Sequence, residues 1–454
     1  MKKYSIILLA ALSMGSFTAC DDVLDVEPTT AIEAEGAVID FTTLNRSALG
    51  TYSIMQSDNY YGFRYLLYQD VYADNLAHTG TFTTDREVSA RRINASNLQL
   101  SSTWATMYSA INRANIVIRD ADRLTNITDE QRNQIKGEML FIRGLVHFDL
   151  VKVFGDIPYI TTPTTTIEEI QVLGKTPVSQ VYDNVIADLQ QAESLLGTTA
   201  RRDPRRASGL AAAALQARVQ LQRGNNAQAE AKADQVIESD AFALVNNFGD
   251  LYTNEGISNV ESIFELDFTL NDANSLGTAS DPTSAGQKFY LRADAYAALE
   301  ASAENGDERF EATTRIQSSR RRLLKYEDIA NNADNVIIIR LAEMYLIRAE
   351  ARARQGAAAL PAAPQVISDI NEIRERVNLD PLLVLTNAQA LTEILEQRRL
   401  EFIGEGLRFT DLKRYNLTCE VLGFCDEEAF RNLWPIPLQQ IEVNPNLAPQ
   451  NPGY

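Results

Sequence analysis

The sequence predicts a mostly α-helical protein, in which stacked helical hairpins form a scaffold that carries a loop-rich insertion with minor β-structure. Three observations support this fold class. Apolar residues recur at helical spacing through much of the 454-residue chain. Two stretches, 205–239 and 340–378, each have the pattern of two helices joined by a short turn. Between them, residues 255–335 lose this periodicity and become polar and rich in glycine and serine.

The first hairpin, 205–239, turns at Gly224-Asn225-Asn226, and alanines recur where its helices would pack closely. Its length resembles that of a tetratricopeptide (TPR) unit. The second hairpin repeats this pattern loosely, with Gln355-Gly356 at the turn and a Pro- and Ala-rich insertion after it. Such pairs need neighbours to cover their apolar faces, so we expect a TPR-like superhelix. Its frame segments are roughly 37–57, 103–240 and 336–415.

Two capping boxes mark the starts of further helices. Thr128 with Gln131 opens a helix that we expect to continue to about Phe154, and Thr386 with Gln389 opens another. His147 lies on the apolar face of the first of these helices. A hydrogen-bonded core histidine is the more common situation on such a face than a metal ligand.

The helix after Thr386 is unusually rich in charge. Its apolar stripe is interrupted by acidic and basic residues, and Gly404 and Gly406 are expected to end it. One interpretation is a solvated face with ion pairs. The other is a set of partly buried Arg–carboxylate pairs that fix the helix against its neighbours, where an unpaired partner costs about 3–5 kcal/mol. The charged residues are Glu396, Arg398, Arg399, Glu401, Glu405, Arg408 and Asp411.

Two segments outside the frame are expected to be loop-rich, at roughly 58–102 and 255–335. The first begins with closely spaced aromatic residues and continues as a long irregular excursion. In the second, Phe264, Leu266, Phe268 and Leu270 alternate with polar residues, which predicts a half-buried strand. The residues 416–454 form a proline-rich tail that cannot remain helical for long.

The N-terminus has the features of a signal peptide at 1–19. Lys2 and Lys3 precede a short apolar run, which is too short to span a membrane as a mature helix. The junction Phe17-Thr18-Ala19-Cys20 resembles a bacterial lipobox. We therefore expect lipidation at Cys20, followed by a tether at 20–36. Several acyl chains on one cysteine give stable membrane anchoring, whereas a single chain is marginal.

Two cysteines remain, Cys419 and Cys425, separated by five residues. An exported protein meets an oxidising environment, which favours a disulfide bond between them. Two free thiols are the alternative. No histidine lies nearby in the sequence, so a metal site is disfavoured.

Composition argues against several function classes. The net charge is −19, and phosphate contact needs clustered positive charge, so nucleic acid is not an expected partner. The sequence has only two histidines and lacks a phosphate-binding glycine loop, Cys/His ligand spacing and a serine nucleophile elbow. Acidic residues are too numerous to exclude a catalytic carboxylate pair by counting. We expect no enzymatic activity and no cofactor, and the sequence singles out no metal-binding residue.

Three motifs carry a resemblance to a known family. They are QRRLEFIGEGLRFTDLKR at 397–414, FIRGLVHFDLVKVFGDIP at 141–158, and the terminal LWPIPLQQIEVNPNLAPQNPGY at 433–454. Together they resemble the SusD/RagB-type surface lipoproteins of Bacteroidetes. Gln397, Gly144 and His147 stand where the family usually has Glu, Ala and Tyr. Asp21 and Asp22 resemble the acidic export tag of such lipoproteins.

The resemblance implies a single SusD-like domain at 37–454, anchored by lipid on the exterior face of the outer membrane. It implies a non-catalytic binder that captures a glycan and delivers it to a SusC-like TonB-dependent transporter. A peptide ligand, as in the RagB branch, is one alternative. A TPR-type protein-interaction scaffold without a small ligand is another.

The ligand-binding residues of this family lie on variable loops, so candidates are chosen by composition. Sugar rings stack on aromatic faces, and their hydroxyl groups need planar polar partners. The stretches 60–92 and 271–292 offer both. The candidate ligand-binding residues are Tyr60, Tyr61, Asp74, Asn75, His78, Phe82, Arg86, Phe289, Tyr290 and Arg292.

Arginines also gather in the first of these stretches, against an acidic background. This local excess of positive charge raises the hypothesis of an anionic ligand, such as a uronic or sulfated glycan. The arginines are Arg64, Arg86, Arg91 and Arg92. Trp104 and Trp434 are expected to be structural, since one begins a helical stripe and the other lies in the tail.

Overall fold

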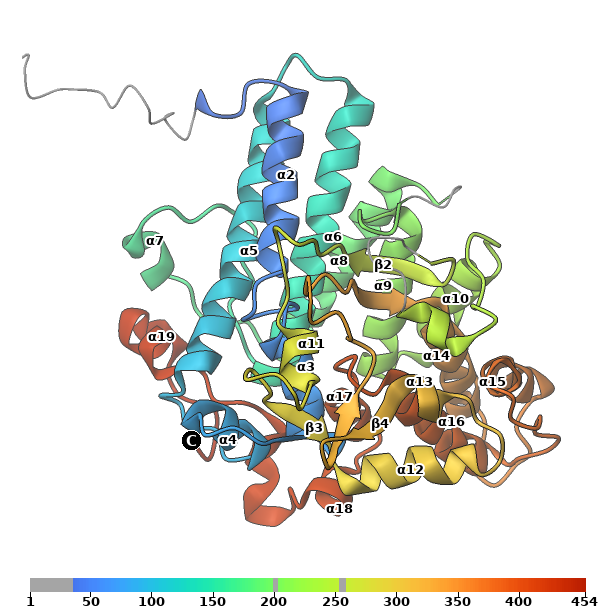
Figure 1. The fold of residues 1–454 in the computed structure, drawn as a ribbon. Coiled ribbons are helices and arrows are strands. Elements are labelled where there is room, and N and C mark those ends of the chain that lie inside the picture. Colours follow the sequence, from blue (N-terminus) through green and yellow to red (C-terminus); the bar gives the residue numbers. More distant parts are fainter. Residues whose placement is uncertain (1–35, 199–202, 253–258) are drawn as a thin grey trace, which may run out of the picture.

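The computed structural model describes residues 36–198, 203–252 and 259–454. Long helices stand together on one side of the molecule, shorter hairpins extend from them, and the minor strands lie between (Figure 1). The mostly α-helical fold class is confirmed. The signal peptide, Cys20 and all but the last residue of the tether lie outside the described residues.

The frame is built from helices that pack in a continuous series. Consecutive members contact one another from α2 and α5 through α6, α8, α9 and α10 to α14, which contacts both α15 and α16. The frame helices are α2 (Phe41–Met55), α5 (Leu98–Arg123), α6 (Asp129–Phe154), α8 (Val178–Leu196), α9 (Gly209–Arg223), α10 (Asn226–Ile237), α14 (Leu341–Gln355), α15 (Pro364–Arg376) and α16 (Asn387–Phe402).

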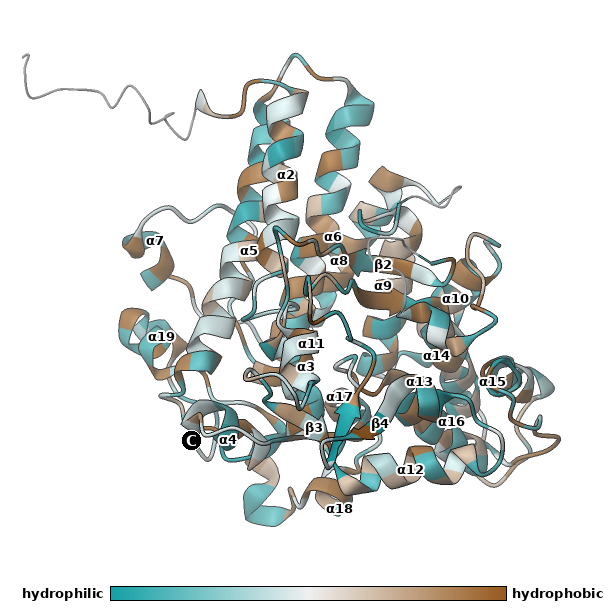
Figure 2. Cartoon of the chain, viewed as in Figure 1, coloured by the Kyte–Doolittle hydropathy of each residue, from teal (hydrophilic) through white to brown (hydrophobic). Residues whose placement is uncertain are grey.

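Both capping boxes form as expected. Thr128 accepts from the backbone N–H of Gln131, and Thr386 accepts from that of Gln389. The second half of α6 is buried on every side because α2, α5 and α8 surround it. Figure 2 shows hydrophilic residues at the outer ends of α2 and α6 and apolar residues around α9.

The two expected hairpins are α9 with α10 and α14 with α15. Gly224 ends α9 with φ of 84°, a left-handed conformation that glycine adopts without steric cost. Alanines line α9, which is almost entirely buried. Their small side chains allow α8, α10 and α14 to approach it closely.

Within the described ranges, the insertion contributes strands to three two-stranded antiparallel ribbons, and short helices lie between these strands. The ribbons are β1 (Leu76–His78) with β3 (Phe289–Leu291), β2 (Ser262–Leu266) with β6 (Val336–Arg340), and β4 (Thr314–Gln317) with β5 (Arg320–Leu323). The helices of this region are η3 (Phe248–Leu251), α11 (Leu276–Ser280), α12 (Ala293–Ala303) and α13 (Arg309–Thr313).

The expectation of a half-buried strand from 264 to 270 is wrong. All five residues of β2 are buried, because it pairs with β6 and packs on α9. Glu265 is buried with its carboxylate accepting from Asn335 at 3.0 Å, whereas Leu270 lies beyond the strand and is 69% exposed. Apolar and polar residues alternate along β2, but both kinds of residue are buried.

The segment 58–102 is more ordered than expected, since it contains α3 (Arg64–Tyr72) and α4 (Thr83–Ser89). Tyr65, Tyr68 and Tyr72 have the spacing of one helical face, and all three are fully buried. Their hydroxyl groups donate to Asp149, Asp85 and Arg431, respectively. The aromatic run therefore forms core rather than a surface loop.

The C-terminal tail returns to the start of the core. The Trp434 backbone N–H donates to the Val153 carbonyl at 2.7 Å, and Asn451 donates to the carbonyls of Phe154 and Trp434. A disulfide bond joins Cys419 to Cys425. The elements here are α17 (Arg408–Arg414), α18 (Thr418–Leu422), η4 (Asp426–Asn432), α19 (Leu438–Val443) and η5 (Pro445–Leu447). The remaining short helix, α7 (Ile167–Gln171), lies beside α5.

Candidate functional site

The β1–β3 ribbon brings together the two stretches from which the candidate residues were chosen. Ala77 lies opposite Tyr290, and His78 lies opposite Phe289. The sequence marked both stretches but held no signal that they pair. The candidate site is therefore one surface built from α4, the β1–β3 ribbon and the neighbouring β4–β5 hairpin.

Five of the ten candidate residues are buried, so they offer no face to a ligand. Tyr60 and Tyr61 each donate a hydrogen bond of 2.6 Å to Asp149 Oδ2, beneath the surface. Phe289 is 1% exposed and packs against Phe63, with ring centroids 5.5 Å apart. Their aromatic character serves core packing, which composition alone did not distinguish from ligand stacking.

The other two buried candidates are polar and are held by internal partners. The Asp74 carboxylate accepts from Arg408 at 2.7 and 2.9 Å and pairs with Arg399 at 3.1 Å. The Asn75 amide donates to Asp70 at 2.6 Å. These side chains connect α3 to the α16–α17 region and are withdrawn from the candidate binding residues.

Arg292 and His78 are half-buried. The Arg292 guanidinium donates to the carbonyls of Leu76 and Ser89, which gives it a bracing role between the ribbon and α4. The His78 ring packs on Phe289 at 5.5 Å, and burial lowers its pKa. Among the described residues, neither ring nitrogen of His78 has a hydrogen-bond partner. It is thus a neutral side chain at the inner edge of the surface.

Three candidates remain exposed or half-exposed: Phe82, Arg86 and Tyr290. Phe82 is 60% exposed, which is unusual for a large apolar ring. Arg86 follows it by one helical turn on α4. Tyr290 lies on the face of the ribbon opposite to buried Phe289, because neighbouring strand residues alternate between the two faces.

Cationic side chains that were not chosen as candidates surround these aromatic rings. Lys288 Nζ lies 5.1 Å from the Phe63 ring centre and 5.2 Å from that of Phe82. The guanidinium groups of Arg320 and Arg321 lie 5.2 and 5.7 Å from the Tyr290 ring centre. The consecutive arginines at 320–322 were the available sequence signal, although Arg322 itself is buried on Asp281.

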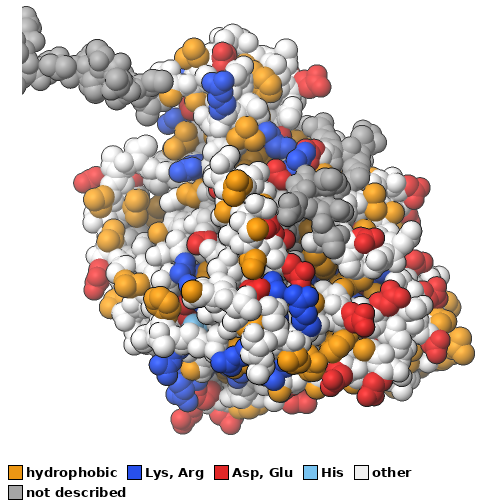
Figure 3. All heavy atoms as spheres, viewed as in Figure 1, with side chains coloured by type: hydrophobic (Ala, Val, Ile, Leu, Met, Phe, Trp, Pro, Cys, Tyr) orange, Lys and Arg blue, Asp and Glu red, His pale blue; other side chains and the backbone are white. Residues whose placement is uncertain are grey.

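We call this group the basic–aromatic surface. Figure 3 shows Lys and Arg side chains gathered over α4 and β3 on this face of the molecule. Of the four arginines noted in the sequence, two do not belong to it. The Arg91 guanidinium donates to the carbonyls of Tyr72 and Ala73, and Arg92 borders a hollow beside Phe430 and Tyr454. The surface consists of Arg64, Phe82, Arg86, Lys288, Tyr290, Arg320 and Arg321.

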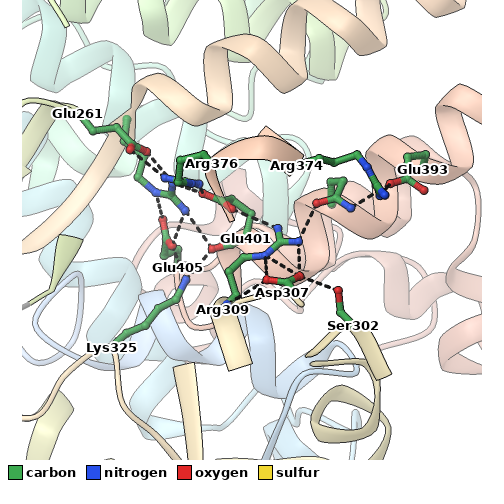
Figure 4. A network of polar contacts seen from close by, with 12 residues as sticks. Glu261, Ser302, Asp307, Arg309, Lys325, Arg374, Arg376, Glu393, Glu401 and Glu405 are labelled. Atoms are coloured by element: carbon green, nitrogen blue, oxygen red, sulfur yellow. Dashed lines mark hydrogen bonds and ion pairs between the residues drawn. The ribbon is translucent and has the colours of Figure 1, made fainter. Parts of the chain in front are cut away.

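The charge-dense helix α16 has a different role. Glu401 lies at the centre of a buried ion-pair cluster with Arg309, Arg340 and Arg376, and Lys325 and Glu405 extend it (Figure 4). Four basic side chains face four acidic ones, so the charges balance. This outcome confirms buried pairs over a solvated face. The cluster consists of Glu261, Asp307, Arg309, Lys325, Arg340, Arg376, Glu401 and Glu405.

The ion pairs in this cluster determine the protonation states of its carboxyl groups. Burial would raise the pKa of Glu401, but the guanidinium groups of Arg376 and Arg340 lower it well below its ordinary value. Burial is likewise outweighed at Glu405, whose pKa is lowered by Arg340 and Lys325. Both groups are therefore ionised at neutral pH and act as structural counter-charges.

His147 is fully buried in α6, as expected for a core histidine. Its Nε2 accepts from the backbone N–H of Ile160 at 3.1 Å, which leaves Nδ1 to donate to the Arg143 carbonyl at 2.9 Å. Burial lowers its pKa to about 3. His147 is thus neutral and structural.

An apolar cavity of about 250 Å³ lies between α5, α7 and the tail, away from the basic–aromatic surface. Trp104 and Tyr108 form one wall. The Tyr108 hydroxyl already donates to the Pro158 carbonyl, and Asn112 is hydrogen-bonded to Thr164 through both amide atoms. These polar groups hold the neighbouring loop in place.

Two features are absent from the described residues. Within 36–198, 203–252 and 259–454, no helix is both long and apolar enough to cross a membrane. In the same part of the chain, no three His, Cys, Asp or Glu side chains are grouped so as to hold a metal ion.

Comparison with solved structures defines the class of fold. A SusD superfamily protein from Bacteroides thetaiotaomicron has a TM-score of 0.80 and 24% identity, and the match covers 91% of this chain and 100% of that one. A laminarin-binding SusD-like protein has a TM-score of 0.78 and 25% identity, with 91% and 99% covered. The fold is that of the SusD superfamily.

Sequence comparison supports the same conclusion. The family described as "Starch-binding associating with outer membrane" matches residues 22–221, and the family described as "SusD family" matches residues 315–423. SusD-like protein P2 of Formosa agariphila is 28% identical over the full length of both chains. The starch-binding protein SusD of Bacteroides thetaiotaomicron is 32% identical over 26% of this chain and 22% of its own length. The chain belongs to the SusD/RagB family.

Proposed function

We propose that this protein is a glycan-binding lipoprotein on the exterior face of the outer membrane, which captures an oligosaccharide or polysaccharide and delivers it to a SusC-like TonB-dependent transporter. Membership of the SusD/RagB family supports this proposal, together with the likeness to a laminarin-binding SusD-like protein. Lipidation at Cys20 would supply the membrane anchor. Its test is the membrane fraction of a Cys20→Ser variant, which we expect to lose attachment.

The main structural support for glycan binding is that two aromatic rings, Phe82 and Tyr290, are accessible on the basic–aromatic surface. Phe82 is 60% exposed and Tyr290 is half-exposed, and each has a cation close to its ring. A sugar can stack on such a ring while the neighbouring cations donate hydrogen bonds to its oxygen atoms. The five buried candidates provide the rigid support beneath.

We propose further that the protein does not cleave its ligand. A retaining or inverting glycosidase needs two carboxyl groups about 5–9 Å apart, one of which donates a proton. Glu401 and Glu405 are buried and held ionised, so neither can be that donor. Incubating the protein with a bound oligosaccharide should leave its chain length unchanged. Appearance of shorter products would overturn this part of the proposal.

Calorimetry with a panel of oligosaccharides tests the binding function. Phe82→Ala and Tyr290→Ala should each weaken binding of the best ligand by about fivefold, in line with about 1 kcal/mol for ring contacts. Tyr182→Ala is the control, since this half-buried tyrosine lies on α8 in the frame. If the panel is blank, or if both site variants bind normally, the surface is not the glycan site.

A further inference from the structure

The basic–aromatic surface carries positive charge that the protein itself leaves uncompensated. In the described residues, no carboxylate forms an ion pair with Lys288, Arg86, Arg320 or Arg321. The chain as a whole carries a net charge of −19. Many arginines elsewhere are closely paired: Arg348, for example, binds both Asp234 and Asp369.

The geometry of these cations is defined rather than diffuse. The Lys288 ammonium lies between a buried ring, Phe63, and an exposed ring, Phe82. Arg321 Nε donates to the Leu291 carbonyl at 2.8 Å, which fixes its guanidinium beside Tyr290. Arg320 adds a second guanidinium against the same ring. Such contacts limit the freedom of the charged groups before any ligand arrives.

Two polar candidates that would suit a neutral sugar are not available here. Asp74 and Asn75, the acidic and amide candidates, are 6% and 1% exposed and are bonded internally. The charged groups that lie against the exposed rings are cations. A guanidinium presents a planar pair of N–H donors that matches a carboxylate or sulfate group, and an ammonium adds a point charge.

We infer that the ligand is an acidic glycan, whose uronate carboxylates or sulfate esters pair with Lys288, Arg320 and Arg321 while its sugar rings stack on Phe82 and Tyr290. This inference rests on the proposed glycan-binding function and specifies the ligand class at that same surface. The local geometry supports it, because Lys288, which directly precedes β3, lies against the Phe82 ring, and Arg320 and Arg321 lie against the Tyr290 ring. One acidic sugar unit can thus contact a ring and a cation together.

The experiment compares one polyuronate oligosaccharide with its carboxyl-reduced form, which keeps the sugar rings and lacks the charges. We expect the acidic form to bind at least about tenfold more tightly. Its advantage should shrink when the salt concentration rises from about 0.1 M to about 1 M, because screening then acts within about 3 Å. A sulfated galactan and its desulfated form provide a second matched pair.

Variants test whether the preference for the acidic oligosaccharide arises at the basic–aromatic surface. Lys288→Gln and Arg320→Gln should weaken binding of the acidic form more strongly than binding of the reduced form, because only the acidic form loses a charge pair. Arg46→Gln is the matched control, since it removes one exposed arginine from α2 in the long-helix region. Phe82→Ala should weaken both forms. Circular dichroism melting curves establish that each variant is folded.

The outcomes separate the two proposals. Equal affinity for the acidic and reduced forms, without salt dependence, overturns the acidic-ligand inference and leaves glycan binding intact. A folded protein that binds no glycan of either kind overturns both proposals. Binding to anionic phospholipid vesicles, with no binding to acidic glycans, would assign the cations to a membrane surface and also overturn the inference.

Discussion

Replacing Glu401 with glutamine tests whether the buried ion-pair cluster stabilises the fold. The Glu401 carboxylate is fully buried and accepts from Arg340 at 2.6 Å and from Arg309 at 3.2 Å, with Arg376 also bound. Glu401→Gln would leave these guanidinium groups with one positive charge in excess. Breaking a buried pair in this way costs about 3–5 kcal/mol, a large share of a typical stability of about 5–15 kcal/mol. Urea unfolding followed by circular dichroism at pH 7 should show a clearly lower midpoint.

The same variant should also change the response to acid. The pKa of Glu401 is lowered in the folded protein, so the unfolded chain binds its proton first as the pH falls. The stabilisation is therefore complete above the unfolded value of about 4.3 and is lost progressively as the pH falls below it towards the folded pKa. Glu401→Gln lacks this contribution, so its stability should fall less steeply between pH 5 and pH 3.

The control is Glu300→Gln, which neutralises an exposed acid on α12. It should leave the urea midpoint unchanged. If Glu401→Gln behaves like this control at pH 7 and also between pH 5 and pH 3, the balanced cluster makes no net contribution to stability. The reasoning from an unpaired buried charge is then refuted.

Three further predictions concern other parts of the molecule. Arg399→Ala should lower the urea midpoint, because Asp74 loses one of its two arginine partners. Calorimetry on the folded fraction should give an unchanged ligand affinity. Loss of binding by a stable variant would place Arg399 in the binding site. Reducing the Cys419–Cys425 disulfide bond should lower the free energy of unfolding by about 2 kcal/mol in the chain-entropy model. Urea unfolding with and without reductant measures this loss, and equal midpoints would contradict it. The NMR signal of His147 should stay that of a neutral ring from pH 7 down to pH 5, because burial lowers its pKa to about 3. A titration near pH 6.5 would instead show that the ring is accessible to solvent.

The helical frame was predictable because its signals are local. Capping boxes at Thr128 and Thr386 and the turn at Gly224 each depend on residues within one or two turns of the chain. Two of the three family motifs, at 141–158 and 397–414, lie inside the matched ranges. The charge density of α16 allowed two interpretations, and the structure shows buried ion pairs rather than a solvated face.

The candidate site was harder to predict because its contacts are long-range. Tyr60 and Tyr61 look the same in sequence as Tyr290, yet the first two are buried over Asp149 from α6. Whether an aromatic residue is core or surface depends on which distant element covers it. The pairing of His78 with Phe289 likewise joins segments that no local pattern connects.

The tail has a consequence for how the chain tolerates the loss of this segment. Trp434 is 0% exposed and lies edge-on to both Tyr72 and Phe154, which belong to α3 and α6. Both helices come much earlier in the chain than the residue that covers them. A polypeptide cut before Trp434 would therefore keep an open apolar seam, which proteases and chaperones recognise. Closure of this part of the core thus depends on contacts between residues that are far apart in the chain.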